Sequence, residues 1–280
     1  MSTKYTELND LTIGFVGAGN MAQALISGIL AKGLSPDRIL ASDPSQSCRD
    51  TLAAMGVRVT EVNREVVSQS DIVILAVKPQ LMRQIAEPLA GSLNDQHQPL
   101  IVSIAAGISS AMLASWLEGD YPIVRCMPNT PALLQAGAAG LYATEAVSDE
   151  QRAVSGRLLS AVGEVVWLES EAEIDAVTAL SGSGPAYFFF MLEAMISKAV
   201  ELGLREDKAR LLAQQTALGA AKMTIESDDA IESLRARVTS PNGTTHAAIS
   251  SFEHNRFAAV IAEAMQAAYD RSIEMENELA

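Results

Sequence analysis

The chain has little of what metal centres and disulfide frameworks require. Its 280 residues include only two cysteines, Cys48 and Cys126, and three histidines. His97, His246 and His254 do not have the spacing of metal ligands, and two isolated cysteines make no disulfide framework. We therefore expect a protein without a bound metal that works in a reducing compartment, with the cytoplasm as the default.

Positive charge, aromatic residues and long apolar segments are also scarce. The formal net charge is −14 at pH 7, and aromatic residues make up 5% of the chain. Because nucleic acids and anionic membranes attract proteins mainly through Lys and Arg, we expect neither as a partner. No apolar run is long enough to span a membrane, and residues 1–10 are polar and lack the core of a signal peptide.

Aliphatic residues are abundant, and hydrophobic residues make up 49% of the sequence. From residue 11 to about residue 170, short β-branched runs alternate with helical stretches, which is typical of βαβ units on a parallel sheet. The expected strands are 11–16, 38–42, 57–60, 71–77, 100–104, 123–126 and 165–168. The expected helices are 20–31, 45–55, 64–69, 81–90, 109–117 and 149–161. This part of the chain predicts a doubly wound sheet.

After residue 168 the hydrophobic pattern becomes helical. Apolar residues follow helical spacing through 187–202 and 257–273. The segment 209–223 is apolar around most of its circumference, and such helices are usually buried on all sides. Because a domain of this size has little interior, we expect part of that surface to contact another subunit. The alternative is the central helix of a monomeric bundle. The predicted domains are residues 1–170 and 171–280.

The segment Gly17–Ala22 joins the first expected strand to the first expected helix. A strand, a Gly-x-Gly-x-x-Ala turn and a helix, in that order, form the context of a dinucleotide-binding fingerprint. Gly17 permits the tight turn, Gly19 lets the backbone approach a pyrophosphate, and the helix N-terminus favours phosphate. A tight turn without a ligand is the alternative, but the position between strand and helix favours a dinucleotide.

Asp43 ends the second expected strand, where dinucleotide-binding folds select their cofactor. A carboxylate there accepts hydrogen bonds from the 2′-OH of NAD(H) and repels the 2′-phosphate of NADP(H). Asp43 is equally well placed to cap the next helix, a role for which Ser45 and Ser47 compete. The sequence therefore leaves the choice between the two cofactors open.

Three further stretches end strands at the sheet edge where open α/β folds bind ligands. Lys78-Pro79 follows the fourth strand, and Pro79 can open a helix. The small residues Ala105–Gly107 follow the fifth strand and would let a flat nicotinamide lie against the backbone. Met127–Pro131 forms a stiff loop after the sixth. Ordinary turns are the alternative in each case.

The stretch Ser240–Thr245 interrupts the helical pattern. Ser-Pro-Asn-Gly is a strong turn sequence, and a helix follows it. The N–H groups of Gly243, Thr244 and Thr245, together with nearby hydroxyls, can converge on one carboxylate without any Arg or Lys. An ordinary helix cap is the alternative.

Taken together, these motifs resemble the pyrroline-5-carboxylate reductases, in order and register, from about residue 11 to residue 275. Ser-Pro-x-Gly-x-Thr is the most specific of them, and the glycine fingerprint is the least specific. The matching segments are Gly17–Ala22, Ala76–Pro79, Met127–Pro131, Asp175–Thr178, Ser181–Tyr187 and Ser240–Thr245.

The resemblance implies the last step of proline biosynthesis, in which NADPH, or alternatively NADH, delivers a hydride to the C=N carbon of Δ1-pyrroline-5-carboxylate. It implies an N-terminal Rossmann-type doubly wound parallel sheet followed by an all-α dimerisation domain. It also implies that the helical domain interleaves with that of a second copy and that such homodimers often join into a decameric ring.

The resemblance also assigns residues. It places Glu171, Ser240, Gly243, Thr244 and Thr245 around the substrate. Arg237 stands where some relatives carry Asn, and Asn242 replaces a frequent Gly; both departures bear on the carboxylate pocket but not on the reaction. The positions implied for the dinucleotide are Val16, Gly17, Ala18, Gly19, Asn20, Met21, Ser42, Asp43, Asn63, Ala76, Val77, Lys78, Pro79, Ala105, Ala106 and Gly107.

The implied chemistry needs neither a covalent nucleophile nor a metal, because the enzyme mainly positions two molecules and favours the protonated imine. We assign carboxylate binding to Ser240 and the neighbouring amides, and proton relay to the Thr245 hydroxyl. Glu171 would help to order the substrate loop. The nearest rival, a β-hydroxyacid dehydrogenase, needs a lysine where this chain has Phe188, which cannot do acid–base work. The other rival is a dinucleotide-binding sensor or scaffold without turnover.

Overall fold

The computed structural model describes residue 5, residues 8–93 and residues 97–280. It divides into two compact units, one made of Met1–Ser183 with Ala268–Ala280 and the other of Gly184–Ala267. Residues 171–183 and 268–280, which the sequence analysis placed in the helical domain, therefore belong to the unit that contains the sheet.

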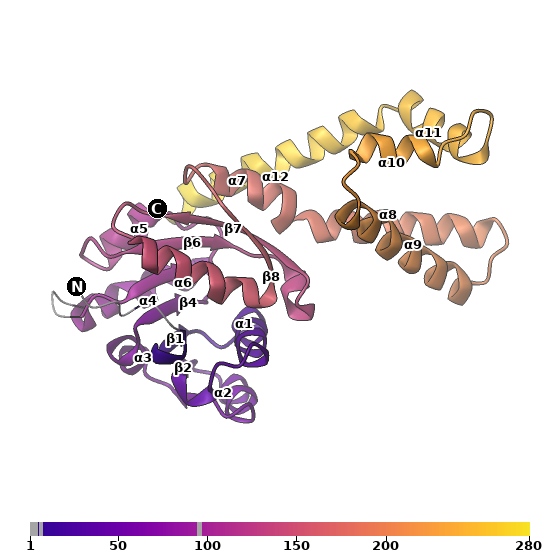
Figure 1. The fold of residues 1–280 in the computed structure, drawn as a ribbon. Helices are drawn as coiled ribbons and strands as arrows, with labels where there is room; N and C mark the ends of the chain where they lie inside the picture. Colours follow the sequence, from indigo (N-terminus) through magenta and orange to yellow (C-terminus); the bar gives the residue numbers. More distant parts are fainter. Residues whose placement is uncertain (1–4, 6–7, 94–96) are drawn as a thin grey trace. The chain divides into compact units, whose positions relative to one another are not determined.

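The first unit is built on one eight-stranded sheet (Figure 1) with the strand order β3-β2-β1-β4-β5-β6-β7-β8. Each pair of neighbours is parallel except β6 and β7, which are antiparallel. The strands are β1 (Ile13–Val16), β2 (Ile39–Ser42), β3 (Arg58–Thr60), β4 (Ile72–Leu75), β5 (Leu100–Ser103), β6 (Ile123–Met127), β7 (Gly137–Ala143) and β8 (Gly163–Trp167). The order runs outward from β1 in both directions, which confirms the predicted doubly wound sheet.

Strand β7 is the one that the sequence analysis missed. Its sequence, Gly-Ala-Ala-Gly-Leu-Tyr-Ala, is rich in residues that strands disfavour, so local composition gives no signal. The strand exists because β6 pairs with it on one side and β8 on the other.

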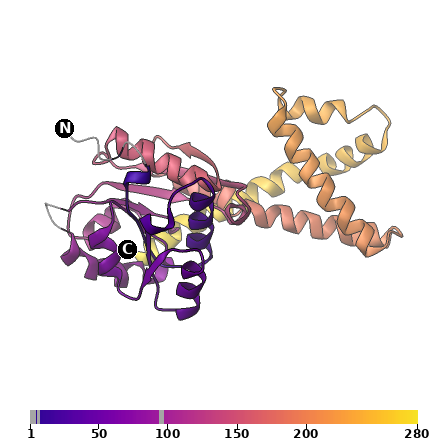
Figure 2. The same cartoon turned by 60° about the horizontal axis from the view of Figure 1, so that its bottom comes forward.

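Helices cover both faces of the sheet (Figures 1 and 2). Alternate residues of each strand point to opposite faces, so Phe15 joins one core and Val16 the other. Side chains of α1, α2 and α6 fill the first core, and those of α3, α4 and α5 fill the second. These helices are α1 (Asn20–Ala31), α2 (Gln46–Ala53), α3 (Asn63–Gln69), α4 (Pro79–Ala86), α5 (Ser110–Trp116) and α6 (Asp149–Leu159).

Short α7 (Glu173–Val177) follows β8, and the end of α12 (Phe257–Leu279) returns to this unit. The Ser272 hydroxyl donates a 2.6 Å hydrogen bond to Asp175, and Leu279 packs against the second core. The C-terminal turns of the chain are therefore part of the sheet unit.

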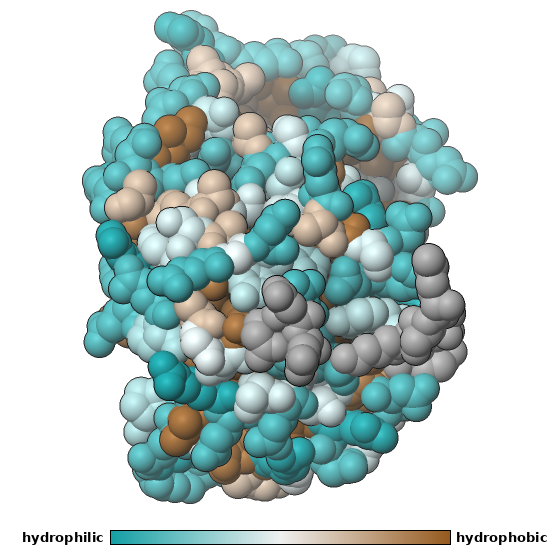
Figure 3. Space-filling model, turned by 90° about the vertical axis from the view of Figure 1, so that its left-hand side faces the viewer, coloured by the Kyte–Doolittle hydropathy of each residue, from teal (hydrophilic) through white to brown (hydrophobic). Residues whose placement is uncertain are grey.

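The second unit contains α8 (Gly184–Glu201), α9 (Glu206–Glu226), α10 (Ile231–Arg237), α11 (Thr244–His254) and the start of α12. Many large apolar side chains of this unit are exposed, among them Phe190 at 74% and Leu211 at 67%. By contrast, the face of the molecule in Figure 3 is mainly hydrophilic, with hydrophobic side chains in small separate groups. Exposed apolar surface on this scale is typical of an interaction site.

Among the described residues, none of the helices combines the length and the hydrophobicity needed to cross a bilayer.

Candidate functional site

The glycine turn after β1 has the geometry that a dinucleotide fingerprint requires. Gly17 has a φ of +100°, and a Cβ at this position would lie 2.6 Å from the Ala76 carbonyl oxygen. Glycine is therefore required by both conformation and space. By contrast, a Cβ added to Gly19 would have no atom of the described residues within 4 Å, apart from its own chain neighbours and helix backbone. The open side of this turn leads into the N-terminus of α1. In the part of the chain that the structure describes, no side chain caps its first amides, so the residues present fit a pyrophosphate.

Asp43 ties this turn to the loop after β2. Its Oδ2 accepts a 2.8 Å hydrogen bond from the Ala18 N–H, and its Oδ1 accepts one of 2.8 Å from the Ser45 N–H. The N-cap residue of α2 is Ser45, which makes no side-chain cap bond. Asp43 thus supports the glycine turn directly, while each carboxylate oxygen keeps acceptor capacity for a further donor.

Arg49 lies beside Asp43, and its guanidinium is committed to protein oxygens. Nη1 donates to the Asp43 carbonyl at 2.6 Å, and Nη2 donates to Gln46 at 2.6 Å and also to Glu61. The residue is only 6% exposed. These hydrogen bonds from Arg49 fix the conformation of the predicted cofactor-selecting loop.

The other positions predicted for the dinucleotide follow neighbouring strands. Lys78 is the N-cap residue of α4, and Pro79 is its first residue. Asn63 begins α3 after β3, and Ala105–Gly107 follow β5, with Gly107 at a φ of +67°. Since the carboxyl ends of parallel strands share one edge, the structure brings these predicted residues together along the edge formed by β3, β2, β1, β4 and β5.

Glu171, predicted near the substrate, lies in the sheet unit and is held by protein groups. Its Oε1 accepts hydrogen bonds from the Ser110 N–H at 2.6 Å and from Arg125 Nη1 at 2.8 Å. Its Oε2 accepts one of 2.5 Å from the Ser110 hydroxyl. Burial acts to raise the pKa of Glu171, but the hydrogen bonds from Ser110 and Arg125 outweigh it, so the pKa lies below its ordinary value of 4.5. Glu171 is therefore ionised at neutral pH.

Sequence reasoning missed Arg125 and Ser110, the partners of Glu171. Arg125 is 4% exposed in the middle of β6, and a charge inside the apolar run Ile-Val-Arg-Cys-Met was the available signal. Next to it, burial raises the pKa of the Cys126 thiol to about 12, so this thiol is not a nucleophile at neutral pH.

The predicted substrate stretch lies in the helical unit, in front of α11. The Gly243 N–H donates to the Ser240 carbonyl at 3.0 Å, and Asn242 has a φ of +62°, as the third residue of a type II turn does. α11 begins at Thr244, and among the described residues no side chain caps its N-terminus. The turn therefore presents amides and exposed hydroxyls together, as anion binding requires.

Arg237, the first departure from the resemblance, makes a 2.7 Å ion pair with Asp229. Asn242, the second departure, occupies a left-handed conformation that Asn tolerates better than most residues, and Gly best. Both are compatible with the turn as it stands.

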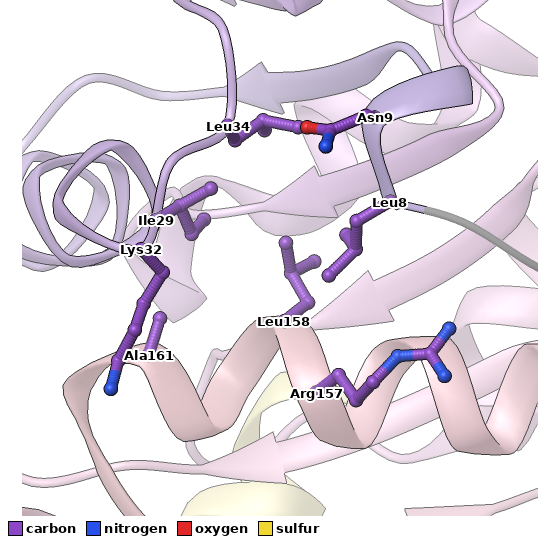
Figure 4. A pocket seen from close by; sticks show the side chains of 8 residues that line it. All are labelled: Leu8, Asn9, Ile29, Lys32, Leu34, Arg157, Leu158 and Ala161. Carbon is purple, nitrogen blue, oxygen red and sulfur yellow. The ribbon is translucent and has the colours of Figure 1, made fainter.

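A small pocket in the sheet unit lies away from this edge (Figure 4). It has a volume of about 100 Å³ and is lined in part by Ile29 and Lys32, at the opposite end of α1 from the glycine turn. Figure 4 shows Leu8, Ile29 and Leu158 pointing toward one another. This apolar floor and small volume do not fit a dinucleotide. Within the described parts of the chain, no three or more His, Cys, Asp or Glu side chains are grouped so that they could hold a metal ion.

Two family models match the chain. One is described as pyrroline-5-carboxylate reductase dimerisation and covers residues 171–275. The other is described as NADP oxidoreductase, coenzyme F420-dependent, and covers residues 12–107. The first match spans the whole helical unit and adjoining residues of the sheet unit, and the second covers strands β1 to β5.

Curated relatives are similar over nearly the whole chain. The pyrroline-5-carboxylate reductase of Pseudomonas aeruginosa is 52% identical over 268 residues, which are 95% of this chain and 97% of the relative. That of Haemophilus influenzae is 45% identical over 266 residues, with coverages of 95% and 97%.

Solved structures are similar as well. The pyrroline-5-carboxylate reductase of Coxiella burnetii gives a TM-score of 0.90 at 39% identity and covers 95% of this chain and 98% of its own. The Plasmodium falciparum pyrroline carboxylate reductase, solved with NADP bound, gives a TM-score of 0.86 at 27% identity, with coverages of 96% and 100%.

Proposed function

Because the chain belongs to the pyrroline-5-carboxylate reductase family, it is an oxidoreductase of proline biosynthesis, and we propose that the Ser240–Thr245 turn binds its substrate. The enzyme reduces the C=N bond of Δ1-pyrroline-5-carboxylate with NAD(P)H and releases L-proline. The observation that carries this function is the 52% identity to such a reductase over 95% of the chain.

The α11 N-terminus binds the substrate carboxylate. The Gly243, Thr244 and Thr245 amides donate to it, and the Ser240 hydroxyl adds a further donor. Support comes from the turn geometry, since no side chain closes this helix end and the hydroxyls are exposed. Helix N-terminal amides favour an anion through both hydrogen bonds and the dipole.

The edge of the sheet binds the dinucleotide, and NADPH is the preferred form, with NADH as the alternative. When bound, the reduced nicotinamide supplies the hydride. Support for NADPH comes from the family matched at residues 12–107 and from the relative solved with NADP. The amides at the start of α1 hold the pyrophosphate, and Asp43 keeps the turn that presents them in place.

The Thr245 hydroxyl orients or relays the proton that the ring nitrogen needs. A threonine hydroxyl is too weak an acid to protonate an imine unaided, so its part is to connect the nitrogen with water.

The helical unit is the dimerisation domain, and dimers assemble further into a decamer in the cytoplasm. The exposed apolar residues of α8 and α9 support association of two copies. The decamer is inferred from the resemblance, and the cytoplasm from the low cysteine content.

Replacement of Thr245 tests the catalytic part of the proposal. Purified wild-type protein is mixed with Δ1-pyrroline-5-carboxylate and either NADPH or NADH, and loss of the reduced cofactor is recorded. We expect Thr245→Ala to lower kcat/KM by about 100-fold, the usual scale of assisted proton transfer. Thr239→Ala is the matched control, because the Thr239 hydroxyl is already bonded to the Arg235 carbonyl.

Two results count against the proposal. If the wild-type protein consumes neither cofactor, the proposed reaction is wrong. If the wild-type protein is active and Thr245→Ala keeps its kcat/KM, the proton role of Thr245 is wrong.

A further inference from the structure

The geometry points to a role for Glu171 that differs from the substrate contact predicted for it. We propose that Glu171 is a positioning residue for the nicotinamide half of the dinucleotide site and acts through the N-terminus of α5. The inference rests on the proposed function only in that Ala105–Gly107 receive the nicotinamide.

The sheet order places the β5 loop under that half of the cofactor. The glycine turn follows β1, and the cofactor-selecting loop follows β2, so the adenosine half lies toward β2 and β3. A dinucleotide that crosses β1 continues over β4 and β5 on the other side. The small residues Ala105–Gly107, which follow β5, are therefore the natural floor for the nicotinamide.

Glu171 fixes the far end of this loop. The loop leaves β5 at Ser103 and enters α5 at Ser110, where the Glu171 carboxylate accepts both the backbone N–H and the hydroxyl. Between these ends, Ile108 is fully buried in the second core. A carboxylate on the first N–H of a helix also gains from the helix dipole. Moving Glu171 would thus move the start of α5 and, with it, the loop.

Arg125 holds Glu171 in place, and the end of α12 contacts the loop. Arg125 is almost fully buried, so it needs a charged partner, and Glu171 is the close one at 2.8 Å. Glu276 lies 3.9 Å from the same Arg125 nitrogen. A Cβ on Gly107 would lie 3.3 Å from Met275 Cβ and 3.4 Å from the Glu276 nitrogen, so α12 covers the outer side of the loop.

No substrate contact is needed to explain Glu171. Its two carboxylate oxygens already accept three hydrogen bonds from protein donors. A carboxylate with three protein donors fixes the positions of those donors. Ser110, at the end of the loop, supplies two of the three.

The test compares binding of two probes to the full-length protein. NADPH carries the nicotinamide, whereas 2′-phospho-ADP-ribose keeps the adenosine half and the diphosphate but lacks the ring. We expect Glu171→Gln to weaken NADPH binding about tenfold, the scale of one lost charge-assisted hydrogen bond, and to change binding of 2′-phospho-ADP-ribose less than about twofold. The KM for Δ1-pyrroline-5-carboxylate at saturating NADPH should not change.

Glu173→Gln is the matched control. Glu173 lies on the same segment, but among the described residues its carboxylate is bonded only to Ser170 and to the Glu169 N–H. Both probes should bind this variant like the wild type. Ser110→Ala is the milder variant if Glu171→Gln does not fold, because it removes the hydroxyl bond and leaves the N–H bond to Glu171. It should weaken NADPH binding about threefold and leave the ring-less probe unchanged.

Each remaining result overturns the inference. Equal loss for both probes means that Glu171 supports the whole unit rather than the nicotinamide half, and no loss for either means that the loop does not depend on it. A higher substrate KM with unchanged NADPH binding means that Glu171 contacts the substrate. Because the binding measurements need no turnover, they can fail while the wild-type reductase activity is intact, and the reverse also holds.

Discussion

At the scale of single residues, two carboxylates of the sheet unit accept hydrogen bonds from backbone amides of loops. Asp43 accepts the Ala18 N–H in the glycine turn, and Glu171 accepts the Ser110 N–H at the start of α5. Both bonds lie at the edge where the strands end, and both fix a loop that we propose to meet the dinucleotide. A ligand that meets loops already in place loses less free energy in ordering them, which favours binding.

The lowered pKa of Glu171 predicts a pH dependence of stability. A carboxyl whose pKa is lower in the folded state stabilises the fold fully above its unfolded value, near 4.5, and loses that contribution as pH falls through the folded value. At pH 7 we expect Glu171→Gln to lower the free energy of unfolding by about 1.5–3 kcal/mol, because it removes a charge-assisted bond to a buried arginine. The difference between wild type and variant should shrink below pH 4.5.

Urea unfolding of both proteins at a fixed protein concentration, at pH 7 and at steps below pH 4.5, measures this difference. Comparison with the variant cancels the titration of the other carboxyls. A difference that stays constant down to the lowest pH at which both proteins fold would contradict the prediction.

At the scale of elements, the sequence predicts the helices and strands that local hydrophobic patterns encode. It does not predict a strand that forms only by pairing with other strands of the sheet. The glycine turn, α1 and the buried parallel strands could be predicted, because hydrophobic runs and turn glycines lie next to one another in the chain. Strand β7 could not, since its pairing with β6 and β8 exists only in the folded sheet. The same holds for the candidate site: motifs predict which loops meet the ligands, whereas the Glu171–Arg125 pair joins residues distant in sequence.

Gly140 of β7 is explained by the close packing of α7 on this strand. A Cβ on Gly140 would lie 2.7 Å from Val177 Cγ2 and 2.9 Å from Cγ1 in α7. We expect Gly140→Ala to lower the free energy of unfolding by about 1–3 kcal/mol through overpacking. Gly91→Ala is the control, because among the described residues its added Cβ would meet only Arg64 Nη2, at 3.8 Å. Equal midpoints of chemical unfolding for Gly140→Ala and Gly91→Ala would show that α7 does not press on β7.

At the scale of the whole molecule, the two units differ in how they bury apolar surface. The sheet unit encloses two cores of aliphatic side chains, whereas few residues of the helical unit are buried. A groove of about 460 Å³ between α8 and α9 is lined almost entirely by apolar residues, including Phe188, Met195 and Ala217. A helix pair that leaves such a groove open gains stability when a second copy covers it.

A charge placed in this groove should therefore separate the copies. We expect Ala217→Arg to shift the protein from the dimer, or a larger assembly of dimers, toward the monomer, because an unpaired guanidinium cannot be buried in an apolar interface without a large desolvation penalty. Gln215→Arg adds the same charge to α9 at an exposed position on the side of the helix away from the groove and should leave the mass unchanged. Sedimentation equilibrium gives the masses, and circular dichroism checks that the helices remain. The wild-type mass also distinguishes a dimer from a decamer. A fully dimeric, helical Ala217→Arg protein would mean that copies associate through another surface, and the exposed apolar residues of α8 and α9 would then need a different explanation.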